Sequence, residues 1–110
     1  MPLKNTNIHH YLDIKPLKIT ENIKDLYQTI LSMNDEKELH RFFQDLLTAK
    51  EIHEFSNRWL AAQMLHNNIH YSEIVSKTKM STTTVARIKK WLYADIGGYK
   101  IAIEKKSKLK

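Results

Sequence analysis

Cysteine is absent from this chain of 110 residues, and glycine and proline are scarce, with two of each. Without cysteine the chain has no disulfide framework, no cysteine-ligated zinc site and no thiol nucleophile. Glycine and proline are the residues that most often interrupt helices, so their scarcity favours an all-α domain. A length near 100–150 residues is typical of one domain, and one domain is therefore expected.

Long apolar runs are missing as well. No stretch approaches the roughly 20 apolar residues that a membrane-spanning helix needs. Near the N-terminus, histidines, asparagines and Asp13 stand where an export signal would have an apolar segment. We therefore expect a cytoplasmic protein with no membrane partner.

Positive charge is concentrated toward the C-terminus. The net charge is +6, and residues 72–110 contain ten lysines and arginines but three acids. Residues 20–58 contain eight acids and five bases. A basic C-terminal part suggests contact with a polyanion, and a solvated basic face explains the same charges equally well.

Helical periodicity begins at Thr20. Apolar residues spaced three and four apart predict helices over 20–34, from about Asp35 to Leu46, and over 48–66. Thr48 and Glu51 form a capping box at the start of the third helix, and two asparagines end it. Because the apolar faces are broad for so short a chain, these helices are expected to pack against a second copy.

A helix-turn-helix is predicted after residue 70. A short helix over 72–77 and a turn at 78–80 precede a second helix, which Ser81 caps and which runs to about Leu92. Lys79 stands where such turns favour glycine, at a cost of roughly 1 kcal/mol. An ordinary helical hairpin is the structural alternative. The small core expected between the two helices consists of Ile74, Met80, Val85 and Ile88.

The outward face of the second helix predicts contact with duplex DNA. Hydroxyl, guanidinium and ammonium groups reach base edges and phosphates when a helix N-terminus enters the major groove. No acidic residue lies between Glu73 and Asp95, so no carboxylate there repels a polyanion. The expected DNA-contacting residues are Lys79, Ser81, Thr82, Thr83, Thr84, Arg87, Lys89 and Lys90.

The other polar residues support neither a metal site nor an enzyme. His66 and His70 are separated by the asparagines that end a helix. The zinc-protease pattern that begins at His53 fails because Asn57 stands where the second histidine is needed. Neither a serine–histidine–carboxylate motif nor a phosphate-binding glycine loop is present. We expect no catalytic residue, no metal and no cofactor.

The segment from Leu39 to Lys100 resembles the Trp repressor superfamily, especially its YerC/YecD-like branch. The resemblance implies an intertwined all-helical homodimer with a helix-turn-helix, whose two recognition helices enter successive major grooves about 34 Å apart. It also implies a sequence-specific, double-stranded DNA-binding transcription regulator that acts as a repressor. The matching motifs are Phe43–Glu51, Arg58-Trp59, Tyr71–Ile74, Ser81–Arg87, Trp91-Leu92 and Gly97–Tyr99.

The resemblance also implies an effector site. The repressor of this family binds L-tryptophan through two arginines and a threonine, which correspond to Thr48, Arg58 and Arg87. This chain has Ile88 in place of a glycine and Trp91 in place of a small hydroxyl residue. These larger side chains are expected to fill the space of the ligand's ring, so L-tryptophan is not expected as a corepressor. Arg58 suits an ion pair with a nearby acid equally well.

The expected organisation has four parts. They are an N-terminal arm (1–19), a helical dimerisation region (20–66), a helix-turn-helix region with a C-terminal helix (67–104) and a basic tail (105–110). Trp59 and Trp91 lie on apolar stripes, which favours core packing over base stacking. The lysines of the tail are expected either to add non-specific affinity for DNA or only to increase the solubility of the protein. Two alternatives stay open: a helical protein-interaction or dimerisation module that does not bind DNA specifically, and an RNA-binding adaptor.

Overall fold

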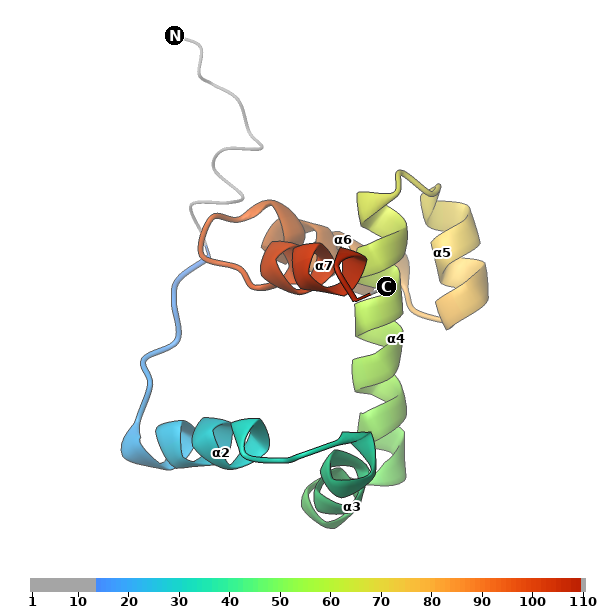
Figure 1. Ribbon diagram of the computed structural model, residues 1–110. Helices are drawn as coiled ribbons and strands as arrows, with labels where there is room; N and C mark the ends of the chain where they lie inside the picture. The colour runs from blue at the N-terminus through green and yellow to red at the C-terminus, as the bar shows by residue number, and fades with distance from the viewer. Residues whose placement is uncertain (1–13, 110) are drawn as a thin grey trace, which may run out of the picture. The chain divides into compact units, whose positions relative to one another are not determined.

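The computed structural model describes residues 14–109, which contain helices and no strand (Figure 1). The expectation of an all-α fold is confirmed. Of the predicted arm, residues 14–19 are not helical, and residues 1–13 lie outside the described residues. The helices are α2 (Glu21–Leu31), α3 (Glu36–Leu46), α4 (Ala49–His66), α5 (Tyr71–Thr78), α6 (Thr82–Tyr93) and α7 (Tyr99–Ser107).

The chain divides into two compact units. The N-terminal unit is Leu17–Phe55, and the second, here called the helix-turn-helix unit, contains Ser56–Lys110. The boundary between them falls inside α4. It falls there because the C-terminal half of α4 contributes Ala61, Ala62 and Leu65 to the same hydrophobic core as α5 and α6.

Side-chain caps determine where helices of the N-terminal unit begin. At the start of α2, Thr20 Oγ1 accepts from the Ile23 amide at 3.2 Å. At the start of α3, Asp35 Oδ1 accepts from the Glu38 amide at 2.9 Å. At α4 the Glu51 amide donates to Thr48 Oγ1 at 3.1 Å, and the Thr48 amide donates to the Glu51 carboxylate at 2.9 Å. The predicted capping box is confirmed.

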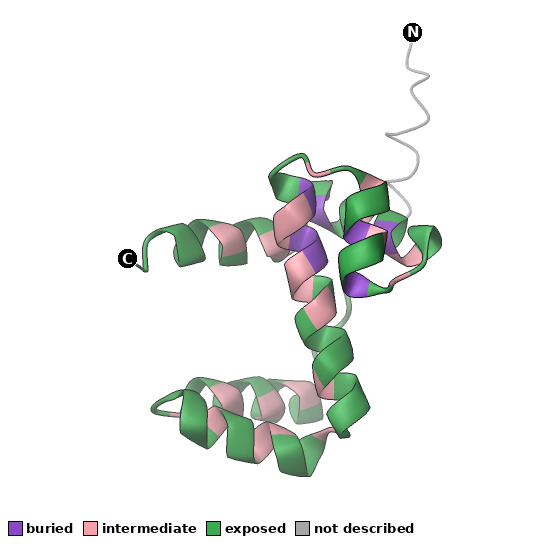
Figure 2. Cartoon of the chain, turned by 90° about the vertical axis from the view of Figure 1, so that its right-hand side faces the viewer, coloured by how far each residue is buried: buried purple, intermediate pink, exposed green. Residues whose placement is uncertain are grey.

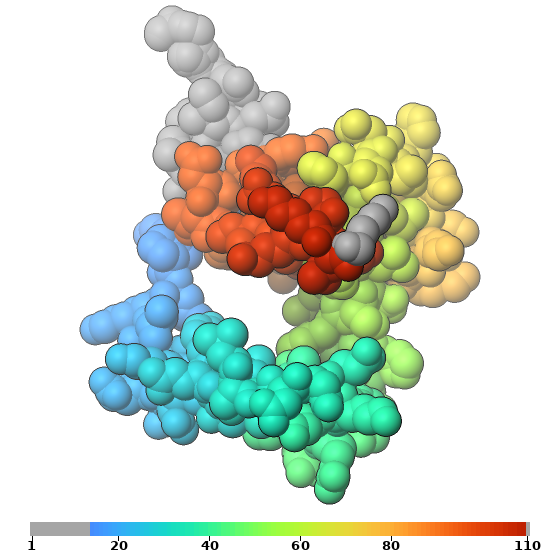
Figure 3. Space-filling view, viewed as in Figure 1, coloured from blue at the N-terminus to red at the C-terminus, as the bar shows by residue number. Residues whose placement is uncertain are grey.

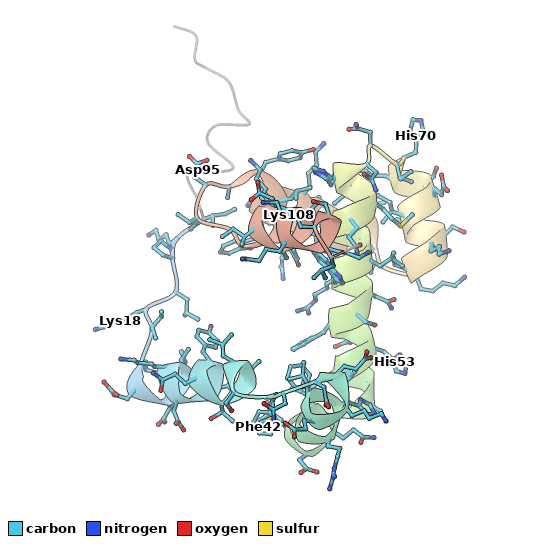
Figure 4. The ribbon with its side chains drawn as sticks, in the orientation of Figure 1. Lys18, Phe42, His53, His70, Asp95 and Lys108 are labelled. Atoms are coloured by element: carbon cyan, nitrogen blue, oxygen red, sulfur yellow. The ribbon has the colours of Figure 1, made fainter. Side chains whose placement is uncertain are left out.

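The apolar faces of α2 and α3 have no buried residue in the single chain (Figure 2). Leu31 at the end of α2 is 83% exposed, and Tyr27 and Leu46 are also exposed. Phe42 and Phe43 of α3 lie with their ring centroids 6.5 Å apart and are only partly buried (Figure 4). This unit therefore presents apolar surface that its own helices do not cover.

The hydrophobic core lies in the helix-turn-helix unit, where Figure 2 shows the buried residues together. α7 lies beside the C-terminal half of α4 (Figure 3), and Lys106 Nζ donates to Gln63 Oε1 at 2.7 Å. Because α7 extends to Ser107, the first three residues of the predicted basic tail are helical. The buried core residues are Ala61, Ala62, Leu65, Ile74, Val85, Ile88 and Leu92.

Glycine is required at one position of this unit. The loop between α6 and α7 contains Gly97, whose amide donates to the Ala94 carbonyl at 3.1 Å. A Cβ at Gly97 would collide with the backbone carbonyl of Trp91, whereas a Cβ at Gly98 would meet open space. Close approach of the loop to the end of α6 therefore depends on Gly97.

Among the described helices, none combines the length and apolar character needed to cross a bilayer.

Candidate nucleic-acid interface

α5 and α6 are joined by a three-residue turn in which one residue is left-handed. α5 ends at Thr78, Lys79 follows with φ 63° and ψ 15°, and its amide donates to the Val75 carbonyl at 2.8 Å. Ser81 is the N-cap of α6, and its Oγ accepts from the Thr84 amide at 3.1 Å. The helix-turn-helix predicted from the sequence is thus present, with the second helix capped at the predicted residue.

The turn is fixed by hydrogen bonds that the sequence does not predict. Thr78 is 3% exposed, and its hydroxyl donates to the Ile74 carbonyl at 2.7 Å and accepts from the Met80 amide at 3.3 Å. Asn57 of α4 donates from Nδ2 to the Thr78 carbonyl at 3.5 Å. Its partner lies 21 residues away in the sequence. These contacts attach the turn to α4 and thereby set the direction in which α6 leaves it.

Three sides of α6 have different surroundings. Val85, Ile88 and Leu92 are buried in the core. Thr82 and Thr83, in the first turn of α6, are exposed, as the sequence analysis expects of residues that contact bases. The free N-terminal amides of a helix attract phosphate oxygens, so the start of α6 favours an anion.

A cavity of about 490 Å³ lies along another side of α6. Two predicted DNA-contacting residues, Thr84 and Arg87, line it, and the Thr84 hydroxyl lies 3.0 Å from Ser81 Oγ. The predicted core position of Trp91 is wrong, because Trp91 is 36% exposed and lines this cavity. The lining residues are Arg58, Thr84, Arg87, Ile88, Trp91, Gly98 and Tyr99.

Two of the three residues that the resemblance assigns to an effector site belong to the helix-turn-helix unit. These two, Arg58 and Arg87, line the same cavity. Thr48 belongs to the N-terminal unit, where its hydroxyl takes part in the capping box. Ile88, expected to fill the ligand space, is 4% exposed and packs in the core, although it also contributes to the cavity wall.

Tyr99 at the start of α7 is the one described residue with a shifted pKa. Burial raises the pKa of Tyr99 above its ordinary value, and the positive charge of Arg58 lowers it by a smaller amount. The phenol therefore remains neutral at physiological pH. Tyr99 therefore adds no negative charge to the lining of the cavity, to which Arg58 and Arg87 also contribute.

Lysines surround the helix-turn-helix. Lys89 is exposed, and its Nζ lies 5.7 Å from the centroid of the Tyr71 ring at the start of α5. Lys79 is exposed in the turn, and Lys90 is partly buried.

The first acid after α6 is Asp95, in the loop before α7 (Figure 4). A cluster of acids and histidines able to hold a metal is absent from the described residues.

Comparison with known proteins agrees with this geometry. The family model described as Trp repressor protein matches residues 21–107. The protein YerC from Bacillus subtilis (strain 168), which is described as uncharacterized, is 34% identical over 85 residues, which are 77% of this chain and 82% of YerC. A crystal structure of a TrpR like protein from Eubacterium eligens ATCC 27750 has a TM-score of 0.74 and 35% identity. The match covers 83% of this chain and 94% of that one.

Two short helices joined by a left-handed turn, with the second capped by serine and flanked by lysines, define a helix-turn-helix protein of the DNA-binding regulator type. Within that class, the family model spans all the described helices, and the resemblance extends to a solved TrpR-like fold. The chain belongs to the Trp repressor family.

Proposed function

We propose that this protein is a sequence-specific double-stranded DNA-binding transcription regulator, a repressor, that acts as a homodimer. The observation that most supports DNA binding is the start of α6. Thr82 and Thr83 are exposed there, Lys79 is exposed in the preceding turn, and Asn57 of α4 donates to a carbonyl of that turn. Hydroxyls positioned by a rigid scaffold contact base edges, and ammonium groups contact phosphates.

The exposed apolar faces of the N-terminal unit support the proposed homodimer. α2 and α3 are amphipathic but have no buried residue, and Leu31, Tyr27 and Leu46 are exposed. Contiguous apolar surface on a small chain is stabilised by burial against another molecule. A second copy presents the same surface, so a two-fold dimer covers both copies at once. Two recognition helices per dimer suit a palindromic operator.

Selection from a random duplex library with the purified full chain tests this function. It is performed at low salt and again at physiological salt. An enriched palindrome with half-sites about one helical turn apart supports the proposal. Binding without enrichment that disappears as salt rises would leave only lysine–phosphate attraction and favour the protein-interaction module. Stronger binding to single-stranded RNA than to duplex DNA would favour an RNA adaptor.

The cavity beside α6 is the proposed place for an effector, with Arg58 and Arg87 as the residues that attract an anionic group. L-Tryptophan is not the expected ligand. Trp91 and Ile88 both contribute to the cavity wall, where smaller residues would leave room for a second indole. A thermal-shift assay with free amino acids tests this point, because a ligand that binds the folded state raises the melting temperature. Protection by L-tryptophan would overturn it.

A further inference from the structure

Ala86 is exposed on α6, yet it is absent from the predicted set of DNA-contacting residues. On a helix, residues three and four positions away are the surface neighbours. For Ala86 these are Thr82 and Thr83 toward the N-terminus and Lys89 and Lys90 toward the C-terminus. The methyl group of Ala86 therefore lies between two threonines and two lysines, of which Lys89 has its ammonium group 5.7 Å from the centroid of the Tyr71 ring.

Other sides of α6 have other surroundings. Val85, Ile88 and Leu92 are buried, and Thr84, Arg87 and Trp91 line the cavity. In the first two turns of α6, the exposed residues that do not line the cavity are Thr82, Thr83 and Ala86. Here we call the surface around Ala86 the Ala86 face: Thr82, Thr83, Ala86, Lys89 and Lys90.

The short side chains of this face permit a close approach to DNA. An α-helix with its side chains is about 10–12 Å across, and the major groove is about 12 Å wide. Thr82, Thr83 and Ala86 are short, so the backbone of α6 can lie deep in the groove. A long side chain at position 86 would hold the helix away from the bases.

We propose that Ala86 is a specificity-determining residue whose methyl group packs against the C5-methyl of a thymine in each operator half-site. The inference rests on the proposed DNA-binding function. Thymine is the base that offers an apolar group in the major groove, and alanine is a side chain suited to contact it.

Replacing thymine by deoxyuridine removes only the methyl group and tests the contact directly. The full-chain protein is titrated against the selected duplex and against duplexes with deoxyuridine at each thymine in turn. We expect one position per half-site at which the substitution weakens binding about fourfold, the factor for burying one methyl group. In Ala86→Gly, which has no Cβ, duplexes with thymine and deoxyuridine at that position should bind equally.

Ala102→Gly is the matched control, because Ala102 is another exposed alanine within a helix of the same unit. It removes a methyl and lowers helix propensity in the same way, and it should retain the thymine preference. Equal binding of thymine and deoxyuridine duplexes by the wild-type protein would overturn the contact while leaving the proposed function intact. A thymine preference that persists in Ala86→Gly would also overturn the proposed contact, because a threonine methyl would then be the group that contacts thymine. Absence of any enriched sequence would overturn the proposed function and this contact together.

Discussion

At the residue scale, Lys79 occupies a backbone conformation that suits glycine. Its φ of 63° lies in the left-handed region, where a Cβ is close to the following carbonyl oxygen. Lysine at this position therefore raises the energy of the folded state. The same residue is exposed in the turn before α6, where its ammonium group is expected to contact phosphate.

Lys79→Gly should consequently change stability and DNA binding in opposite directions. We expect the free energy of unfolding in urea to rise by about 1 kcal/mol, because strain is relieved. Affinity for all duplexes should fall, because one phosphate contact is lost. Asn68→Gly is the control: Asn68 also has φ 62°, but it lies outside the predicted interface, so its DNA affinity should not change. Unchanged affinity in Lys79→Gly would remove Lys79 from the interface.

At position 97, glycine is required for a different reason, because the neighbouring backbone leaves no space for a Cβ. Gly97→Ala places a methyl against the Trp91 carbonyl, which belongs to the backbone and has little freedom to move. We expect a loss of about 1–3 kcal/mol in the free energy of unfolding, as for overpacked positions. Gly98→Ala, where the added methyl meets open space, should cost much less. Equal effects of the two substitutions in urea titrations would contradict the close approach seen in this loop.

At the element scale, α6 is expected to contact both bases and phosphates. Arg87→Ala should weaken binding to the selected operator more than binding to unrelated duplexes. Lys90→Ala should weaken binding to every sequence and reduce the salt slope by about one, since one phosphate contact is lost. Anisotropy titrations of both variants at several salt concentrations measure these effects. Equal losses on all sequences from Arg87→Ala would remove it from the residues that contact bases.

Helix positions were predictable because their signals are local. The capping box at Thr48 and Glu51 and the serine cap at Ser81 lie within three residues of the amides they satisfy. Asparagine ended α4 as predicted, with Asn68 left-handed. These features depend on neighbouring residues alone, so the sequence contains all the information they need.

Contacts between distant segments were not predictable in the same way. The hydrogen bond from Asn57 to Thr78 joins α4 to the turn, and no pattern in the sequence pairs these two residues. Trp91 lies on an apolar stripe but borders the cavity, because Val85, Ile88 and Leu92 already occupy the core side of α6. Periodicity identifies an apolar face, and packing decides which of its members are buried.

At the scale of the whole molecule, the N-terminal unit predicts association. Light scattering should give twice the chain mass of 13.0 kDa. Leu31→Glu introduces a charge on an exposed apolar position of α2 and should shift the protein toward the monomer. Gln28→Glu adds the same charge to the same helix at an exposed polar position and should leave the mass unchanged. A monomeric mass for the wild-type protein would refute the dimer.

The most direct test of a dimeric helix-turn-helix regulator changes the spacing of its operator. About five base pairs are inserted between the half-sites of the selected operator, and the affinity of the wild-type protein for this duplex is measured. Half a turn moves one half-site to the opposite side of the duplex, so two recognition helices fixed in one dimer can no longer reach both. The account predicts that specific affinity falls to the level of a single half-site. Affinity unchanged by the insertion would contradict it.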